Sequence, residues 1–226
     1  MEHALRHPYL RVRGPGGVTY GGSQRRGRAA HMRRWGCGVI AAADLMLYLS
    51  LHRPGCRGTL FAGAPPAEEI DLDWYNDRAD RLRRRWLPVI PWHGINGLAL
   101  AFGVSVCLRR QGIPLHARWG VRPGRLWARI DRLLDADIPV VLSIGGGFPC
   151  FWKKDRLPLY PAPEKCAPAA RTSAHYVIVT GADENWLRIS SWGRCYYINK
   201  AEYCLYTERC SAGLLCNILD IRGQGL

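Results

Sequence analysis

The sequence predicts an α+β fold, with a helical first half and a second half made mainly of antiparallel strands. Two observations predict it: runs of helical length and period lie before about residue 137, and short β-branched runs separated by turn residues follow from residue 138. No internal repeat or low-complexity linker divides the 226 residues. We therefore expect a single domain over residues 1–226, with 1–137 mainly helical and 138–226 mainly β.

The first half opens with a Gly- and Arg-rich stretch, residues 1–36, in which we expect extended segments and loops. From Cys37 to about His52 the sequence is apolar on nearly every side, which predicts a buried central helix. Prolines and turn residues separate the later elements of this half. We expect helices at Leu72 to Trp86, Asn96 to Arg110 and Gly124 to Leu134, and a strand at Pro114 to Val121.

The second half begins with a β-branched run, Ile138 to Ile144, that is typical of a buried strand. A Pro-rich stretch from Phe148 to Ser173 has no regular period, and we expect it to form one wall or a lid of a cleft. Its aromatic residues could line a substrate groove or simply pack the loop: Phe148, Phe151, Trp152 and Tyr160. Further strands are expected at His175 to Gly181, Trp186 to Trp192, Cys195 to Asn199 and Leu214 to Ile221.

The net charge is strongly positive, with 32 basic against 18 acidic residues and a formal charge of +14. All but four of the basic residues are arginines, and two clusters stand out, residues 25–34 and 81–85. A GC-rich genome would produce this bias without any function. The alternative is a positive field that steers anionic partners. No nucleic-acid-binding motif accompanies either cluster.

The sequence lacks the patterns typical of membrane-spanning, secreted, zinc-binding and nucleotide-binding proteins. The apolar stretches are too short to span a bilayer, and the N-terminal residues lack the apolar core of a secretory signal, so we expect a cytoplasmic protein. Nine cysteines occur without any C-x-x-C pair, which gives no support to a structural zinc site. No phosphate loop, dinucleotide fingerprint or H-E-x-x-H motif is present, so we expect neither a cofactor nor a metal.

One cysteine has a distinctive position. The segment Trp35-Gly36-Cys37-Gly38 places Cys37 at the first turn of the predicted central helix. Free amide N–H groups and the helix dipole favour a negative charge there, which lowers the pKa of a thiol. The flanking glycines let a substrate approach the backbone closely. The alternative is a small residue that only packs at a helix start.

A reactive thiol needs a base, and there are seven histidines. His52 lies at the far end of the same helix, about 22 Å away at 1.5 Å per residue, and is excluded. Spacing does not exclude three others, but none of them opens a buried strand: His31, His93 and His116. His175 does open one, after a loop long enough to leave it at a cleft edge. A purely structural histidine is the alternative there.

The next strand supplies candidates to orient this imidazole. Residues 182–185 form a turn, so the strand ending in Ser190-Ser191-Trp192-Gly193 returns beside His175. A hydroxyl there can hold the imidazole in one tautomer while the indole shields the hydrogen bond from water. Asp183 is a poor orienter, because about 26 Å of extended strand separates it from His175.

This order of motifs resembles the papain-like cysteine peptidases: a cysteine heading a central helix, a histidine opening a later strand, and an S-W-G tripeptide on the strand after it. The segment Gly21-Gly22-Ser23-Gln24 resembles that family's oxyanion-hole glutamine. Order and spacing are most similar to bacterial members of the double-glycine (bacteriocin leader) peptidase-like group. The resemblance covers about residues 20–51 and 174–203.

The resemblance implies a role for each matching residue. Cys37 would be the nucleophile, His175 the base that activates it and later protonates the leaving group, and Gln24 a donor to the oxyanion together with the Cys37 N–H. Ser190 stands where the family carries Asn or Asp and would orient His175, or Ser191 would if the turn shifts by one residue. The gap from Gln24 to Cys37 is longer than usual, so the Arg-rich loop between them must fold back.

The expected function is acyl transfer from a peptide or amide bond through a Cys37 acyl-enzyme. We expect a peptide or protein substrate, acidic in character because Arg33 and Arg34 precede the nucleophile, rather than nucleic acid. A papain-like deamidase or acyltransferase would use the same residues. The alternative from another class is a non-catalytic papain-like module that binds an anionic partner through its Arg-rich surface.

Overall fold

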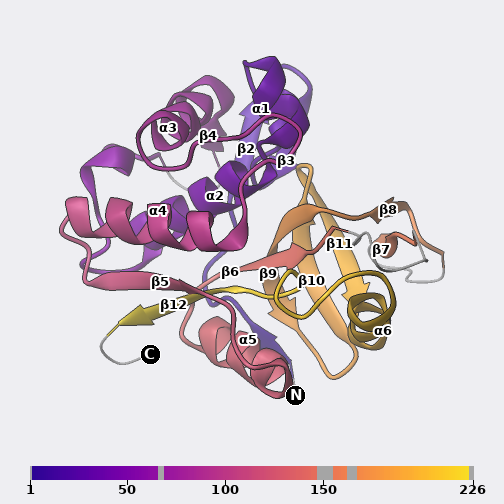
Figure 1. Cartoon of the computed structure of the whole chain (residues 1–226). Helices are drawn as coiled ribbons and strands as arrows, with labels where there is room; N and C mark the ends of the chain where they lie inside the picture. Colours follow the sequence, from indigo (N-terminus) through magenta and orange to yellow (C-terminus); the bar gives the residue numbers. More distant parts are fainter. Residues whose placement is uncertain (1, 66–68, 147–154, 162–166, 224–226) are drawn as a thin grey trace.

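The computed structural model describes residues 2–65, 69–146, 155–161 and 167–223, and it has an α+β architecture. Within these residues, the largest sheet has seven antiparallel strands in the order β1-β9-β10-β11-β7-β8, with β6 also paired to β9 (Figure 1). Their bounds are β1 His3–Ala4, β6 Val140–Ile144, β7 Leu157–Pro161, β8 Ala170–Thr172, β9 His175–Ala182, β10 Trp186–Ser191 and β11 Arg194–Asn199.

Strand β9 is central in this sheet. It pairs with β10 along one edge, and along the other with β6 through residues 175–179 and with β1 through residues 181–182. Five of its eight residues are apolar or glycine and buried after His175, as expected for a strand covered on both faces. The strand that carries the candidate base is therefore fixed on both edges.

Four helices, α1 to α4, lie close together, and α5 and α6 lie apart from them (Figure 1). Figure 1 shows α1 to α4 together on one side of the molecule, with α5 below and α6 at the far end of the sheet. Their bounds are α1 Ala30–Trp35, α2 Cys37–His52, α3 Leu72–Arg85, α4 Gly97–Arg110, α5 Leu126–Asp135 and α6 Lys200–Cys210. The four helices expected from the sequence are confirmed, and α1 and α6 were not expected.

Two small sheets complete the fold. One consists of β2 (Arg11–Gly14), β3 (Gly17–Tyr20) and β4 (Ile70–Asp71), and the other of β5 (Leu115–Trp119) and β12 (Leu219–Gly223). The strand expected from Leu214 begins only at Leu219, because Leu215 and Cys216 donate their N–H groups to Ala212 O in a turn. The extended segments expected in residues 1–36 are β1, β2 and β3.

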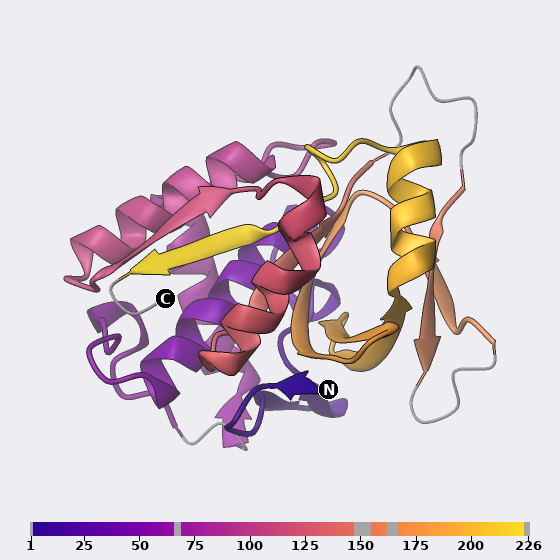
Figure 2. The ribbon, with the colours of Figure 1, turned by 90° about the horizontal axis from the view of Figure 1, so that it is seen from below.

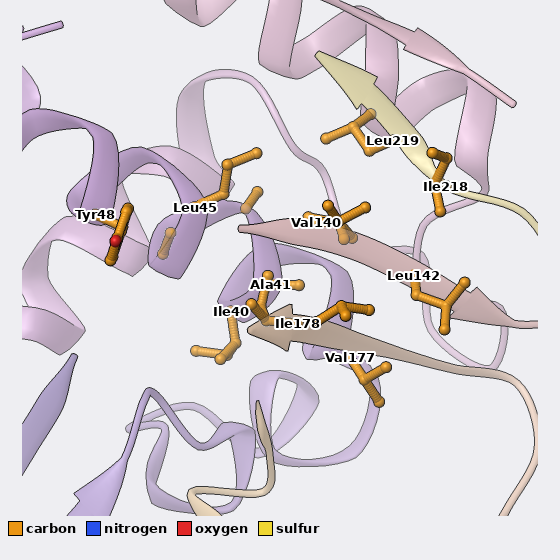
Figure 3. Packing of buried hydrophobic residues seen from close by; sticks show 14 of the residues in the cluster. Ile40, Ala41, Leu45, Tyr48, Val140, Leu142, Val177, Ile178, Ile218 and Leu219 are labelled. Atoms are coloured by element: carbon orange, nitrogen blue, oxygen red, sulfur yellow. The ribbon is translucent and has the colours of Figure 1, made fainter. Parts of the chain in front are cut away.

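Helix α2 is the centre of the core. Thirteen of its sixteen residues are buried, from Gly38 to Ser50. Figure 3 shows Ile40, Ala41 and Leu45 of α2 facing side chains of β6 and β9, among them Val140 and Ile178. Burying each such aliphatic side chain stabilises the fold by about 1.5–3 kcal/mol, so α2 and the two strands hold each other in place.

The expected cleft wall is described only in part. Phe148, Phe151 and Trp152 lie outside the described residues, whereas Tyr160 lies on β7. Across the described chain, no helix combines the length and the apolar character needed to cross a bilayer.

Candidate functional site

Cys37 is the first residue of α2, directly after the short helix α1. Gly36 ends α1 and caps α2 at once, and the Ile40 N–H donates to Gly36 O at 3.0 Å. The cysteine side chain is only partly covered. The thiol therefore stands at the partly exposed start of a helix whose next thirteen residues, Gly38 to Ser50, are buried.

The sulfur of Cys37 lies against the start of β9. The backbone N–H groups of Tyr176, Gly38 and Cys37 itself act to lower the pKa of the Cys37 thiol. Burial outweighs them and raises the pKa of the Cys37 thiol above its ordinary value. The Tyr176 contact places the sulfur one residue along the chain from His175.

His175 is the first residue of β9 and is buried. Its Nε2 lies 2.9 Å from Oγ of Ser191. Burial, and secondarily the charge of Arg25, lower the pKa of His175 to about 3. A neutral imidazole with its proton on Nε2 donates to Ser191 and keeps Nδ1 available to accept a proton.

The ring of Trp192 covers His175. The two rings stack with centroids 4.6 Å apart and an interplanar angle of 21°. Trp192 and Gly193 are the two central residues of the β10–β11 turn, and both have positive φ, 50° and 77°. Two left-handed residues are characteristic of a type I′ hairpin, and here that turn sets the indole over the imidazole.

The two serines of β10 have different partners. Ser190 Oγ donates to Tyr20 O at 2.7 Å, whereas Ser191 Oγ meets His175. Neighbouring residues of a strand face opposite sides, so only one of the two can reach the imidazole. The role that the sequence assigned to Ser190 falls geometrically to Ser191, while Ser190 ties β10 to the segment before Gln24.

Gln24 begins a short 3-10 helix, Gln24–Arg26, and is buried. Its Nε2 donates to Arg33 O at 3.1 Å and to Arg34 O at 3.3 Å. The Arg-rich loop therefore folds back, as the spacing required, and Gln24 is tied to the turn of chain that leads into Cys37. Gln24 Oε1 is buried and has no hydrogen-bond partner among the described residues.

Arg25 lies over the ring of Trp192, with its guanidinium carbon 4.7 Å from the ring centroid. In the sequence Arg25 is one member of a charge cluster; in the structure its charge helps to lower the pKa of His175. Arg33 is bound to the carbonyl groups of Gly27 and Arg28, and Arg34 is exposed. Two arginines, Arg25 and Arg34, thus leave their charge near the site.

Asp44 is a buried carboxyl on α2, two turns after Cys37. It accepts hydrogen bonds from Tyr9 and Tyr75 at 2.8 and 2.6 Å and from the Gly22 N–H at about 3 Å. Burial raises its pKa to about 6. Asp44 thereby anchors the Gly21–Gln24 segment to α2. A lone carboxylate in an apolar helix was the sequence signal for such a role.

Neither similarity to known proteins nor a cluster of metal ligands identifies the chemistry of this site. No protein-family model matches the chain, and no curated protein matches it. Among the described side chains, no group of three or more His, Cys, Asp or Glu converges as metal ligands would. The chemistry of this site therefore depends on Cys37, His175 and the residues that contact them.

Proposed function

We propose that this protein is a cysteine-type acyl-transfer enzyme of papain-like arrangement that acts on a peptide or amide bond. The observation that carries the proposal is the position of Cys37 at the head of the buried helix α2, beside the first residues of β9, where His175 is held by Ser191 and covered by Trp192. Nucleophile, base and orienter are the three parts that such chemistry needs.

The first half of the reaction forms a thioester. The Cys37 sulfur attacks the carbonyl carbon while its proton passes to His175, and the oxygen of the tetrahedral intermediate takes the negative charge. The Cys37 N–H is the backbone donor for that oxygen. The Gln24 amide nitrogen donates to Arg33 O and Arg34 O, so Gln24 joins as a second donor by giving up one of these two bonds. His175 then protonates the leaving amine as the C–N bond breaks.

In the second half, water attacks the thioester. His175 takes one proton from the water and the hydroxyl adds to the acyl carbon. The C–S bond then breaks, the carboxylic acid leaves, and the Cys37 sulfur takes the proton back from His175. An amine in place of water would make the same enzyme an acyltransferase. Burial disfavours both thiolate and imidazolium, so the resting pair is neutral and the proton moves during attack.

The surroundings favour a substrate with an acidic group. Arg25 is exposed beside Trp192, and Arg34 is exposed just before Cys37. On the apolar side, the ring of Trp35 lies 5.3 Å from that of Trp92, which is 79% exposed. A peptide with a carboxylate next to an apolar side chain would contact both kinds of surface.

The test uses 4-nitrophenyl acetate as a small acyl donor, followed by mass spectrometry of the acetylated peptides. We expect repeated turnover, with acetyl trapped on Cys37 after acid quenching. Cys37→Ala should abolish turnover, and His175→Ala should lower the rate about 10²–10⁴-fold. Adding a primary amine and measuring amide product separates a hydrolase from an acyltransferase.

Two matched controls make the result specific. Cys204 is an exposed thiol and His116 an exposed imidazole, both outside the site, so Cys204→Ala and His116→Ala should leave the rate unchanged. Equal acetylation of Cys37 and Cys204, unaffected by His175→Ala, would mean an unactivated thiol and would contradict the proposal.

A further inference from the structure

A second concave feature is lined by arginines and contains none of the candidate-site residues. It is a cavity of about 720 Å³ between β5, α5 and β12. Figure 2 shows α5 and β12 side by side next to β5, on the face seen from below. We call it the arginine pocket, after five arginines of its lining: Arg122, Arg125, Arg129, Arg132 and Arg222.

The local structure brings these side chains together. Arg125, Arg129 and Arg132 are spaced by four and three residues at and after the start of α5, so they share one face of that helix. Arg222 lies on β12 opposite His116 of β5, another lining residue. Helix α5, the loop before it and β12 thus present arginine side chains to the same cavity.

Asp220 is the one carboxylate among the described lining residues, and it is fully buried. Arg129 Nε donates to one of its oxygens at 2.6 Å, and Arg222 Nε donates to the other at 2.7 Å. Arg129 also donates to Ile221 O at 2.7 Å. Asp220 therefore fixes two guanidinium groups by their Nε edges while neutralising only one positive charge.

Among the described residues, the remaining positive charge of the pocket has no carboxylate partner. Arg122, Arg125 and Arg132 are exposed, and no carboxylate of the described residues pairs with them. Like charges gathered in one concavity repel each other, and an anion in the pocket relieves that repulsion. Elsewhere on the surface, by contrast, Arg28 is paired with Asp73 and Asp77.

The shape and chemistry select the kind of anion. A cavity of about 300–1,000 Å³ suits a small ligand, and planar guanidinium forks match phosphoryl oxygens in pairs. We propose that the arginine pocket binds a compact anion that carries two or more phosphoryl groups. Orthophosphate, with one such group, engages fewer of the arginines and binds more weakly.

The experiment titrates tripolyphosphate into the protein by calorimetry at 0.15 M salt. The test variant is Arg125→Gln/Arg132→Gln, and its matched control is Arg81→Gln/Arg84→Gln, which removes the same charge from exposed positions of α3. We expect the test variant to bind at least about tenfold more weakly, and the control to bind like the wild type. Thermal melting should be unchanged in both, because all four side chains are exposed.

Three further arms decide the interpretation. Arg122→Gln, in the loop before α5, should independently weaken binding. Cys37→Ala should bind tripolyphosphate like the wild type, so this site and the proposed enzyme activity succeed or fail separately. Three outcomes would overturn the proposal. The protein could fail to bind tripolyphosphate, or the two double variants could lose binding equally. The third is tighter binding of single-stranded oligonucleotide or phosphatidylglycerol vesicles than of tripolyphosphate.

Discussion

At the scale of single residues, the surroundings of His175 favour its neutral form. Burial under Trp192 and the nearby charge of Arg25 both disfavour the imidazolium form, and Ser191 offers a hydroxyl where a carboxylate would have favoured it. A base that is neutral at rest has a nitrogen free to accept a proton at neutral pH, but a low pKa also makes it a weaker acceptor. The proposed reaction therefore requires the substrate or the developing thiolate to favour the imidazolium form during attack.

The two neighbouring serines give a matched test of this arrangement. Ser191→Ala removes the hydrogen bond to His175 and should lower the 4-nitrophenyl acetate rate about tenfold or more, with the melting temperature nearly unchanged. Ser190→Ala removes the bond to Tyr20 O and should cost about 1 kcal/mol of stability at an unchanged rate. The reverse pattern would return the orienting role to Ser190.

Sequence reasoning could select Cys37 and His175 because each opens an element, and element boundaries are visible in local patterns. It could not separate Ser190 from Ser191, because the choice depends on strand register, and β10 shifts register against β9 between Arg188 and Ile189. The cation–π contact of Arg25 joins residues far apart in the chain, so no local pattern signals it.

At the scale of elements, the first turn of α2 packs closely against Ile95 and Tyr176 at Gly38. A Cβ on Gly38 would lie 2.5 Å from Ile95 Cγ2 and 3.2 Å from the Tyr176 ring, so a side chain there forces α2, the segment before α4 and β9 apart. The same glycine supplies an N–H to the Cys37 sulfur. Gly38 therefore affects both the packing of α2 and the pKa of the Cys37 thiol.

Gly38→Ala tests the close approach. We expect a loss of about 1–3 kcal/mol in the free energy of unfolding, together with a slower 4-nitrophenyl acetate reaction. Gly124→Ala is the control, because a Cβ there has no atom within 4 Å, and it should be nearly neutral in both measurements. Urea denaturation gives the stabilities; a Gly38 variant as stable as the control would refute the steric argument.

The central helix was predictable from one uninterrupted apolar run, and its bounds, Cys37–His52, are confirmed. Helix α6 was missed, because its buried residues are two tyrosines and a cysteine, Tyr203, Tyr206 and Cys210, within a mostly polar sequence. Its Asn199 cap, which accepts from the N–H groups of Ala201 and Glu202, was the available signal. The parallel pairing of β2 with β4 is non-local and leaves no sequence pattern.

At the scale of the whole molecule, two buried ionisable groups act on stability in opposite directions. His175 has a folded pKa of about 3, below its ordinary value, so the unfolded chain binds more protons and stability falls as pH falls from about 6.5. Asp44 has a folded pKa of about 6, above its ordinary value, so its contribution is greatest below about pH 4 and is lost as pH rises towards 6.

His175→Gln isolates the first of these contributions. Between pH 6.5 and pH 5 the wild type should lose up to about 2 kcal/mol more of its unfolding free energy than the variant, since Asp44 is common to both. Chemical denaturation of both proteins at the two pH values measures the difference. Parallel pH profiles would show that His175 titrates normally in the folded protein.

The candidate site combines segments that are far apart in the sequence, and this affects when the site forms during folding. Cys37 belongs to a helix near the start of the chain, whereas His175, Ser191 and Trp192 belong to a hairpin region that follows all of α3, α4 and α5. Contacts between segments so distant in sequence close large loops and form late. A chain emerging during synthesis therefore carries its thiol exposed and without its base until β9 has joined the sheet, and any acyl transfer begins only when folding is nearly complete.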